Sequence, residues 1–467
     1  MDFFWEATRM LLGKKFAQFV EESPISVMMR GVVEYAFDGK RLNEIFEETA
    51  EVQYTRELRF STIADLMAEV VFDISPSIGA AYQANGDQMT VSRKSVYNKL
   101  NRVEPGISAA LVVDSVTQFA PVIEKLRATL PPLLPGYRTK ILDGNHFSAT
   151  EHRIKELRTI GDAPLPGKAL VVLDPLLKLA THVFPCEDGH AQERSLLCQV
   201  LPCVEKNDLW IEDRNFCTLG FLFGIRSRDA KFLVRQHANL PGTLRGRLTY
   251  RGRIQTGRVY EQAMEIIDPT TGSTLTIRRI TVKLNQPTRD GDTEIHILTN
   301  LPQRAADACK VAELYRKRWS IETMFQELTE TLSCEIKTLG YPKAAVFAFC
   351  LALVAYNGIS VIKAALRSVH GPDSVEEQVS GYYLSLEISK TYTGMMIAIP
   401  AKHWTVFRDM SVAELAKVLK ELARRVDLSK YQKHPRGPKL PRPDRVRTGR
   451  SNHVSTARIL ATRKTAH

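Results

Sequence analysis

An alternation of short apolar segments and helix-length segments between residues 139 and 236 constrains the fold most. A Pro-rich break at residues 131–136 (PPLLPG) precedes it and marks a domain boundary. The order along the chain is three strands, a helix, a strand, a helix and a strand, which predicts a mixed sheet covered by helices. The expected strands are residues 139–147, 168–174, 181–185, 209–213 and 231–236, and the expected helices are residues 192–204 and 216–225.

A different pattern follows, in which Thr, Ile, Arg and Gly are frequent. Residues 274–284 (TLTIRRITVKL) alternate between apolar and polar side chains, and the turn sequence DPTTG at residues 268–272 precedes them. This predicts an antiparallel β insertion. We therefore expect a helical region at 1–130, a core at 136–240 and 302–370 with the insertion at 241–301, a helical region at 371–429 and a tail at 430–467.

The N-terminal region contains a basic helix candidate at residues 92–103 (SRKSVYNKLNRV). Its apolar residues recur at helical spacing, which places Arg93, Lys94 and Lys99 on the outward side. Such a helix is able to contact DNA, although basic surface helices without a partner are common. We count these three cations as DNA-binding candidates.

One apolar run, Ala344 to Leu366, is nearly long enough to span a bilayer. Asn357, Gly358 and Lys363 interrupt it, so we expect a buried core helix and no membrane partner. The acidic start Met1-Asp2 argues against a signal peptide. Seven cysteines without a CxxC pair fit reduced thiols in the cytoplasm.

The C-terminal tail supplies most of the formal charge of +12. Residues 430–467 hold eleven Lys and Arg against a single acid, Asp444, and are rich in Pro, Gly, Ser and Thr. This composition predicts a flexible segment suited to a polyanion such as DNA. The alternative is a solvated tail without a partner.

Two aspartates lie where expected strands end. Asp143 lies where the first strand runs into a turn and is followed by Gly144, and Asp213 ends the fourth strand and is followed by Arg214. Strand ends carry catalytic groups in open α/β sheets, because the side chain reaches solvent while the backbone stays rigid. Taken singly, each aspartate also fits a turn or a helix cap.

A third group lies in the sequence YRKRWSIE at residues 315–322. In one helix, Tyr315, Arg318, Glu322 and Thr329 would share a face. That face fits a phosphate clamp beside a metal-binding carboxylate. The alternative is an exposed helix with an Arg318–Glu322 ion pair, worth only about 0.2–0.5 kcal/mol.

Together these elements resemble the DDE transposases of the IS4 family over roughly residues 136–370. The likeness rests on ILDGNH, on IEDRNF, on the β insertion and on the Y-x2-R-x3-E spacing. It implies a ribonuclease-H-like α/β core flanked by helices, with mainly helical N- and C-terminal regions. It further implies that Asp143, Asp213 and Glu322 form an acidic triad, with DNA contacts from Tyr315, Arg318 and Arg214.

The chain departs from the family pattern at two places. Thr329 stands where the family has Lys, seven residues after the Glu, and the nearest downstream lysine is Lys337. The insertion has no Trp, which leaves Tyr250 and Tyr260 as the aromatic candidates for holding a flipped base. Strand cleavage is therefore better supported than a hairpin intermediate.

The residue types point to metal-dependent phosphoryl transfer. Carboxylates suit Mg²⁺, with Mn²⁺ as a substitute, and two ions about 3.5–4 Å apart neutralise the attacking and leaving oxygens. We expect a cut-and-paste insertion-sequence transposase that acts as a homodimer on terminal inverted repeats and target DNA, nucleoid-associated in a bacterial cytoplasm. The alternatives are a transposase-derived DNA-binding protein without catalysis and a metal-dependent nuclease without strand transfer.

Overall fold

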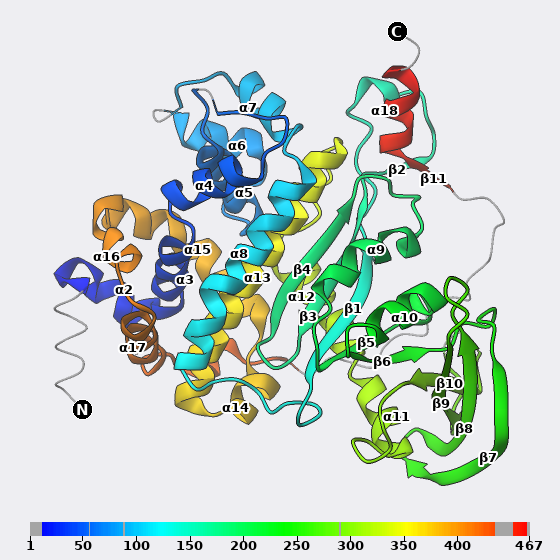
Figure 1. Ribbon diagram of the computed structural model, residues 1–467. Helices are drawn as coiled ribbons and strands as arrows, with labels where there is room; N and C mark the ends of the chain where they lie inside the picture. Colours follow the sequence, from blue (N-terminus) through cyan, green and yellow to red (C-terminus); the bar gives the residue numbers. More distant parts are fainter. Residues whose placement is uncertain (1–11, 56, 87–88, 289–290, 435–451, 465–467) are drawn as a thin grey trace.

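The computed structural model describes residues 12–434 and 452–464, apart from residues 56, 87–88 and 289–290. Their main feature is a mixed sheet of nine strands in the order β4-β3-β1-β5-β6-β10-β9-β8-β7. A body of helices packs along one side of this sheet, as Figure 1 shows. The core strands are β1 (Arg138–His146), β3 (Lys168–Asp174), β4 (Leu179–Cys186), β5 (Asp208–Glu212) and β6 (Lys231–Arg235).

The polarity of the five core strands defines the fold class. β1 pairs antiparallel with β3, and β3 pairs antiparallel with β4. On its other edge β1 runs parallel to β5, which runs parallel to β6. A meander of three strands followed by two parallel strands on the far side of the first is the ribonuclease-H-like arrangement, so the predicted fold class is confirmed.

Alternate strand residues build a core on each face of the sheet. Ile141 and Ile211 belong to the larger core, which includes α8 (Pro105–Lys125) and α13 (Pro342–His370). Leu142 and Trp210 belong to the smaller core under α9 (Leu197–Val200) and α10 (Leu219–Arg226). The predicted helix at 192–204 is instead a series of short turns, η4 (Glu193–Leu196), α9 and η5 (Leu201–Cys203).

The insertion consists of four antiparallel strands that extend the core sheet. They are β7 (Thr243–Ile254), β8 (Gly257–Ile267), β9 (Thr274–Leu284) and β10 (Glu294–Thr299). β10 pairs antiparallel with β6, so the insertion continues the catalytic sheet and is not a sheet of its own. β7 forms the outer edge and is exposed along most of its length.

The helical body surrounds α13. Two helices in the described chain are long and apolar enough to cross a membrane, α8 and α13, and the apolar stretch of α13 is wholly buried. α13 packs against α8 and β4 and is a core helix, as expected from the sequence. The other helices of the body are α2 (Ala17–Glu22), α3 (Pro24–Ala36), α4 (Gly39–Thr49), α5 (Phe60–Val71), α6 (Ile78–Ala84), α7 (Arg93–Leu100), α14 (Pro372–Gln378), α15 (Gly381–Ala398), α16 (Thr405–Arg408) and α17 (Val412–Ala423).

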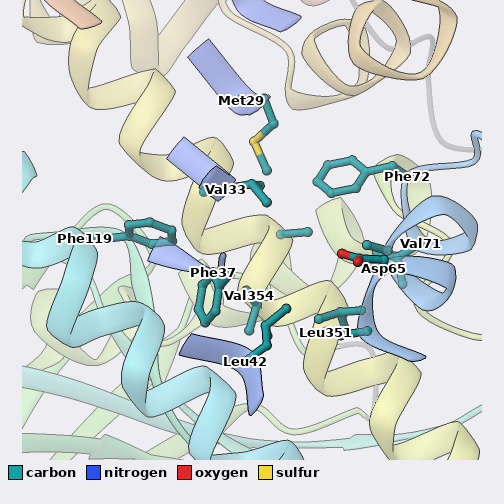
Figure 2. A pocket seen from close by; sticks show the side chains of 14 residues that line it. Met29, Val33, Phe37, Leu42, Asp65, Val71, Phe72, Phe119, Leu351 and Val354 are labelled. Atoms are coloured by element: carbon teal, nitrogen blue, oxygen red, sulfur yellow. The ribbon is translucent and has the colours of Figure 1, made fainter. Parts of the chain in front are cut away.

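An apolar cavity of about 60 Å³ remains between α13 and the helices around it. Figure 2 shows Met29, Phe72 and Phe119 around this space, with the carboxylate of Asp65 at one side. Gly358 of α13 also lines it, and a Cβ at that position would lie 2.8 Å from the Met29 Cε atom. The glycine thus lets α3 approach α13 closely.

The end of the chain is ordered against the core, which differs from the predicted flexible tail. β11 (His453–Ser455) pairs in parallel with β2 (Ala163–Leu165), and α18 (Thr456–Lys464) follows. Arg458 Nε donates to Asp188 Oδ2 at 2.8 Å, while Ser455 and Thr456 are buried. The high positive charge of residues 430–467 gave no indication that part of this region docks on the core. Residues 435–451, which hold much of the predicted tail, lie outside the described residues.

Candidate active site

The register of β1 and β5 brings Asp143 and Asp213 together. Leu142 lies opposite Glu212 in this parallel pair. Asp143 directly follows Leu142 within β1, and Asp213 directly follows Glu212 at the end of β5. Side chains alternate along a strand, and Ile141 and Ile211 both face the larger core. The aspartates therefore point to that same face, at the point where β5 ends.

Asp143 is a largely buried carboxylate with two partners. Its side chain is 17% exposed; Oδ1 accepts the Gly144 N–H at 2.9 Å, and Oδ2 accepts Arg318 Nη1 at 2.7 Å. Burial raises the pKa of Asp143 to about 7; Arg318 opposes this rise, and the charges of Asp213 and Glu322 add to it. The three acids of the predicted triad therefore act on one another electrostatically.

Glu322 reaches the site from α12 (Trp319–Thr331). Its Oε1 accepts Arg318 Nη2 at 2.5 Å, so Arg318 holds one carboxylate from β1 and one from α12. The prediction of one continuous helix is wrong here. α11 (Ala308–Arg316) ends at Arg316, and α12 begins at Trp319 with Arg318 in its N-cap position. Despite the turn between the two helices, the side chains of Arg318 and Glu322 still face each other.

Arg318 is a buried guanidinium between acids. Burial alone would lower its pKa, but Asp143 and the neighbouring charges raise the pKa further than burial lowers it, so Arg318 stays charged. Tyr315, only 9% exposed, lies in the core beside it, and burial raises the pKa of the phenol. Without DNA, Tyr315 packs behind Arg318, and its contact with DNA stays a prediction.

The three acids fit a hard divalent cation by their chemistry, since carboxylate oxygens are the ligands that Mg²⁺ and Mn²⁺ prefer. Their present arrangement is not a ready cage. Arg318 takes one oxygen from Asp143 and one from Glu322. Across the described residues no group of three or more His, Cys, Asp or Glu is placed to hold a metal ion. Arg318 would have to share or release these two oxygens when the acids bind an ion.

Glu193 is an acid beside the site that sequence reasoning missed. It lies at the start of η4, and a Cβ on Gly144 would overlap its carboxylate. Asn215 Nδ2 donates to Glu193 Oε2 at 3.2 Å, and His146 Nδ1 lies 3.7 Å from Oε1. Glu193 thus links the residues that follow Asp143 with the turn that follows Asp213. The one sequence signal was the glycine after Asp143.

The remaining DNA-binding candidates divide into exposed and internal cations. Arg214 is exposed at the mouth of the site, and Arg93 and Lys94 are exposed on α7. Lys99 is partly buried, and its Nζ donates to the Leu58 carbonyl at 3.0 Å and lies over the Phe46 ring. Burial lowers the pKa of Lys99. A DNA contact by Lys99 stays a prediction.

The insertion places its two aromatic candidates together on the outer strands. Tyr250 is 57% exposed on β7, and its ring meets that of Tyr260 edge to face at 5.5 Å between centroids. The Lys283 ammonium lies 5.3 Å from the centroid of Tyr260. This group forms an exposed aromatic and cationic surface at the end of the sheet.

The site thus combines a ribonuclease-H-like sheet with Asp143 on β1, Asp213 directly after the parallel strand β5, and Glu322 on α12. Residues 135–357 match the family model described as "Transposase DDE domain". This match covers 223 of the 467 residues, and it implies polynucleotidyl transferase chemistry. Transposases of this kind typically use divalent metal ions.

Among solved structures, the chain is similar to the piggyBac transposase of a synaptic complex with hairpin DNA. The identity is 11%, the alignment covers 79% of this chain and 82% of that chain, and the TM-score is 0.39. At this TM-score the two backbones diverge too far for a residue-by-residue comparison. No curated protein matches the chain.

Proposed function

We propose that this protein is a cut-and-paste transposase of an IS4-type insertion sequence. The observation that carries the proposal is the placement of Asp143 and Asp213 one residue beyond the paired Leu142 and Glu212 of β1 and β5, with Arg318 joining Asp143 to Glu322. The match of this segment to the transposase DDE domain supports it. The reaction would be cleavage at transposon ends followed by attack of the freed 3′-OH on target DNA.

The roles of the chain's residues follow from their positions. Asp143, Asp213 and Glu322 would hold two Mg²⁺ or Mn²⁺ ions, which supply charge neutralisation at the attacking and leaving oxygens. Asp143 must be ionised for this, and its burial makes release of its proton a condition of binding. Arg318, once it leaves the carboxylates, has a planar donor fork suited to a phosphate beside Glu322.

The DNA partners would be the terminal inverted repeats and the target duplex. Arg214 at the mouth of the site, Arg93 and Lys94 on α7, and the cations of residues 430–467 supply positive charge for the backbone. Cutting two ends requires two active sites, so a homodimer assembled on DNA fits the reaction. Such a protein would work on the nucleoid in the cytoplasm.

A nicking and strand-transfer assay tests the proposal. The substrate is a plasmid that carries the DNA flanking the gene on both sides, incubated with Mg²⁺ or with a chelator. We expect Mg²⁺-dependent nicks at the ends, joined products with precleaved ends, and neither reaction for Asp143→Ala, Asp213→Ala or Glu322→Ala, which should still bind DNA.

Each alternative has its own outcome in this assay. Nicking without joining would indicate a nuclease that lacks strand transfer. Binding without nicking by the wild-type chain would indicate a DNA-binding protein derived from a transposase. Either result would overturn the cut-and-paste proposal.

A further inference from the structure

A polar cavity of about 140 Å³ lies behind α12, on the side away from Glu322. Its walls come from the turn between β3 and β4, from α12, from α13 and from α14, and its charged lining residues are Lys178, Glu327, Lys363 and Glu376. Neither Arg318 nor Glu322 lines it. It is therefore separate from the triad, although one helix borders both.

Glu376 is shared among several cations. Arg367 Nη1 lies 2.7 Å from Glu376 Oε1, and Lys178 Nζ lies 3.8 Å from Oε2. Lys433 Nζ donates to the Glu376 carbonyl oxygen at 2.6 Å. The Glu376 carboxylate thus balances Arg367 and Lys178, while Lys433 bonds only its backbone. With Lys363 and Glu327 included, the cluster holds four cations against two carboxylates.

Lys363 forms the other side of the cluster. Its Nζ lies 3.3 Å from Glu327 Oε1 and 3.4 Å from Oε2. The first residue of α15 is also close, because a Cβ on Gly381 would lie 3.4 Å from Lys363 Nζ. Glu327 neutralises Lys363, while the positive end of the α15 dipole adds to the field.

The electrostatics of Lys178 reflect this excess of positive charge. Burial lowers the pKa of Lys178, and Lys363 and Arg367 lower it again, against the opposing effect of Glu376. The Arg367 side chain is almost wholly buried and does not line the cavity, so it adds charge to the cluster but no donor to the cavity. An anion in the cavity would relieve the repulsion among these cations.

We propose that this cavity binds one phosphate-sized oxyanion. The volume accommodates a tetrahedral anion, since a single water needs only about 10–15 Å³ of such space. Each of the Lys178 and Lys363 ammonium groups has three donor protons, and among the described residues each contacts one carboxylate. The anion is either free inorganic phosphate or a phosphate of the DNA backbone. Binding would fix the wall that α12 provides and so hold the helix that carries Glu322.

A calorimetric titration of the full chain with inorganic phosphate, in a buffer free of other oxyanions, tests the proposal. We expect one saturable site per chain, with affinity reduced at least about tenfold in Lys178→Gln and in Lys363→Gln. Lys40→Gln removes a surface lysine that is similarly paired, with Glu44 at 3.6 Å, and should bind phosphate normally. Thermal unfolding of each variant checks that it folds, and Lys363→Arg should retain most of the affinity.

The source of the anion is distinguished by repeating the titration with duplex DNA bound. If a backbone phosphate occupies the cavity, the duplex abolishes phosphate binding, and both glutamine variants lower the slope of log affinity for DNA against log salt by about one. If free phosphate is the ligand, the duplex leaves its affinity unchanged. Absence of a saturable site in the wild-type chain, or equal binding by wild type and both glutamine variants, would overturn the proposal. None of these outcomes depends on cleavage.

Discussion

The two faces of α12 carry opposite charge balances. On one face Arg318 lies between Asp143 and Glu322, with Asp213 close by, so negative charge exceeds positive. On the other face Glu327 borders the cluster of Lys178, Lys363, Arg367 and Lys433, so positive charge exceeds negative.

The buried residues Ile321, Met324 and Leu328 separate the two faces. A single helix therefore lies between a site suited to cations and a cavity suited to an anion. A substitution should affect one function or the other according to the face on which it lies.

The largest difference between the faces should appear on removing one carboxylate from each. Glu322→Gln should lower end cleavage at least about a thousandfold, because a metal-binding oxygen is lost where several kcal/mol of charge stabilisation are needed. Glu327→Gln removes a similar charge five residues away and should stay within about threefold of wild type. Rates of plasmid nicking measure both. Equal losses would contradict the separation of the faces.

Replacing Arg318 sharpens the comparison on the triad face. Arg318→Lys keeps the charge but cannot reach two acceptors with a planar fork, so cleavage should fall about tenfold or more, equal to about 1.36 kcal/mol in the barrier. Single-turnover cleavage at saturating Mg²⁺ isolates this step. A near-normal rate would show that Arg318 acts as a charge alone.

Disrupting the contact between Gly144 and Glu193, next to Asp143, should have an intermediate effect. Gly144→Ala places a methyl group where the Glu193 carboxylate lies, so Glu193 must leave Asn215 and His146. We expect a loss of cleavage of about three- to tenfold and a destabilisation of about 1 kcal/mol, typical of a lost hydrogen bond. The double variant Gly144→Ala/Glu193→Ala removes the overlap. If it is no more stable to denaturant than Gly144→Ala, the overlap is not the cause.

The smallest expected effect is a gain. Thr329 is exposed on α12 and donates its hydroxyl to the Phe325 carbonyl, so a longer side chain fits there. Thr329→Lys restores the cation of the family pattern and should tighten binding to the ends about two- to fivefold, less than 1 kcal/mol for an exposed charge. The matched control is Thr323→Lys, at an exposed position of α12 that borders the cavity. Equal gains from both would mean that the effect is general attraction.

Much of the sheet could be predicted from the sequence because buried strands have a strong local signal. The strand at 168–174 was predicted at its observed bounds, and Asp213 directly follows β5 as expected. The prediction that the first strand ends at Asp143 was wrong, because β1 continues to His146 in its pairing with β3. Adjoining parallel strands then determine that the side chains of Asp143 and Asp213 lie together. The polar residues that interrupt the apolar run of α13 indicated a buried core helix, which is where α13 lies.

The rest depended on contacts between distant segments. Lys99 sits on an outward position of its helix but reaches the Leu58 carbonyl, which helical spacing alone does not reveal. Tyr315 has the family spacing yet is buried, because it lies on the face of α11 that Val311 and Ala312 bury in the core. Glu193 has no local signature, since its role arises from the fold around Gly144.

The central claim is that Asp143, Asp213 and Glu322 share divalent ions once Arg318 releases them. Iron-directed cleavage of the polypeptide tests this most directly, with Fe²⁺ in place of Mg²⁺, ascorbate and peroxide as the radical source, and duplex DNA bound. The account predicts backbone cuts close to all three residues in the same chain, suppressed by excess Mg²⁺ and lost in Glu322→Ala, but retained in Glu327→Ala. Cuts confined to other segments, or a pattern unchanged in Glu322→Ala, would contradict it.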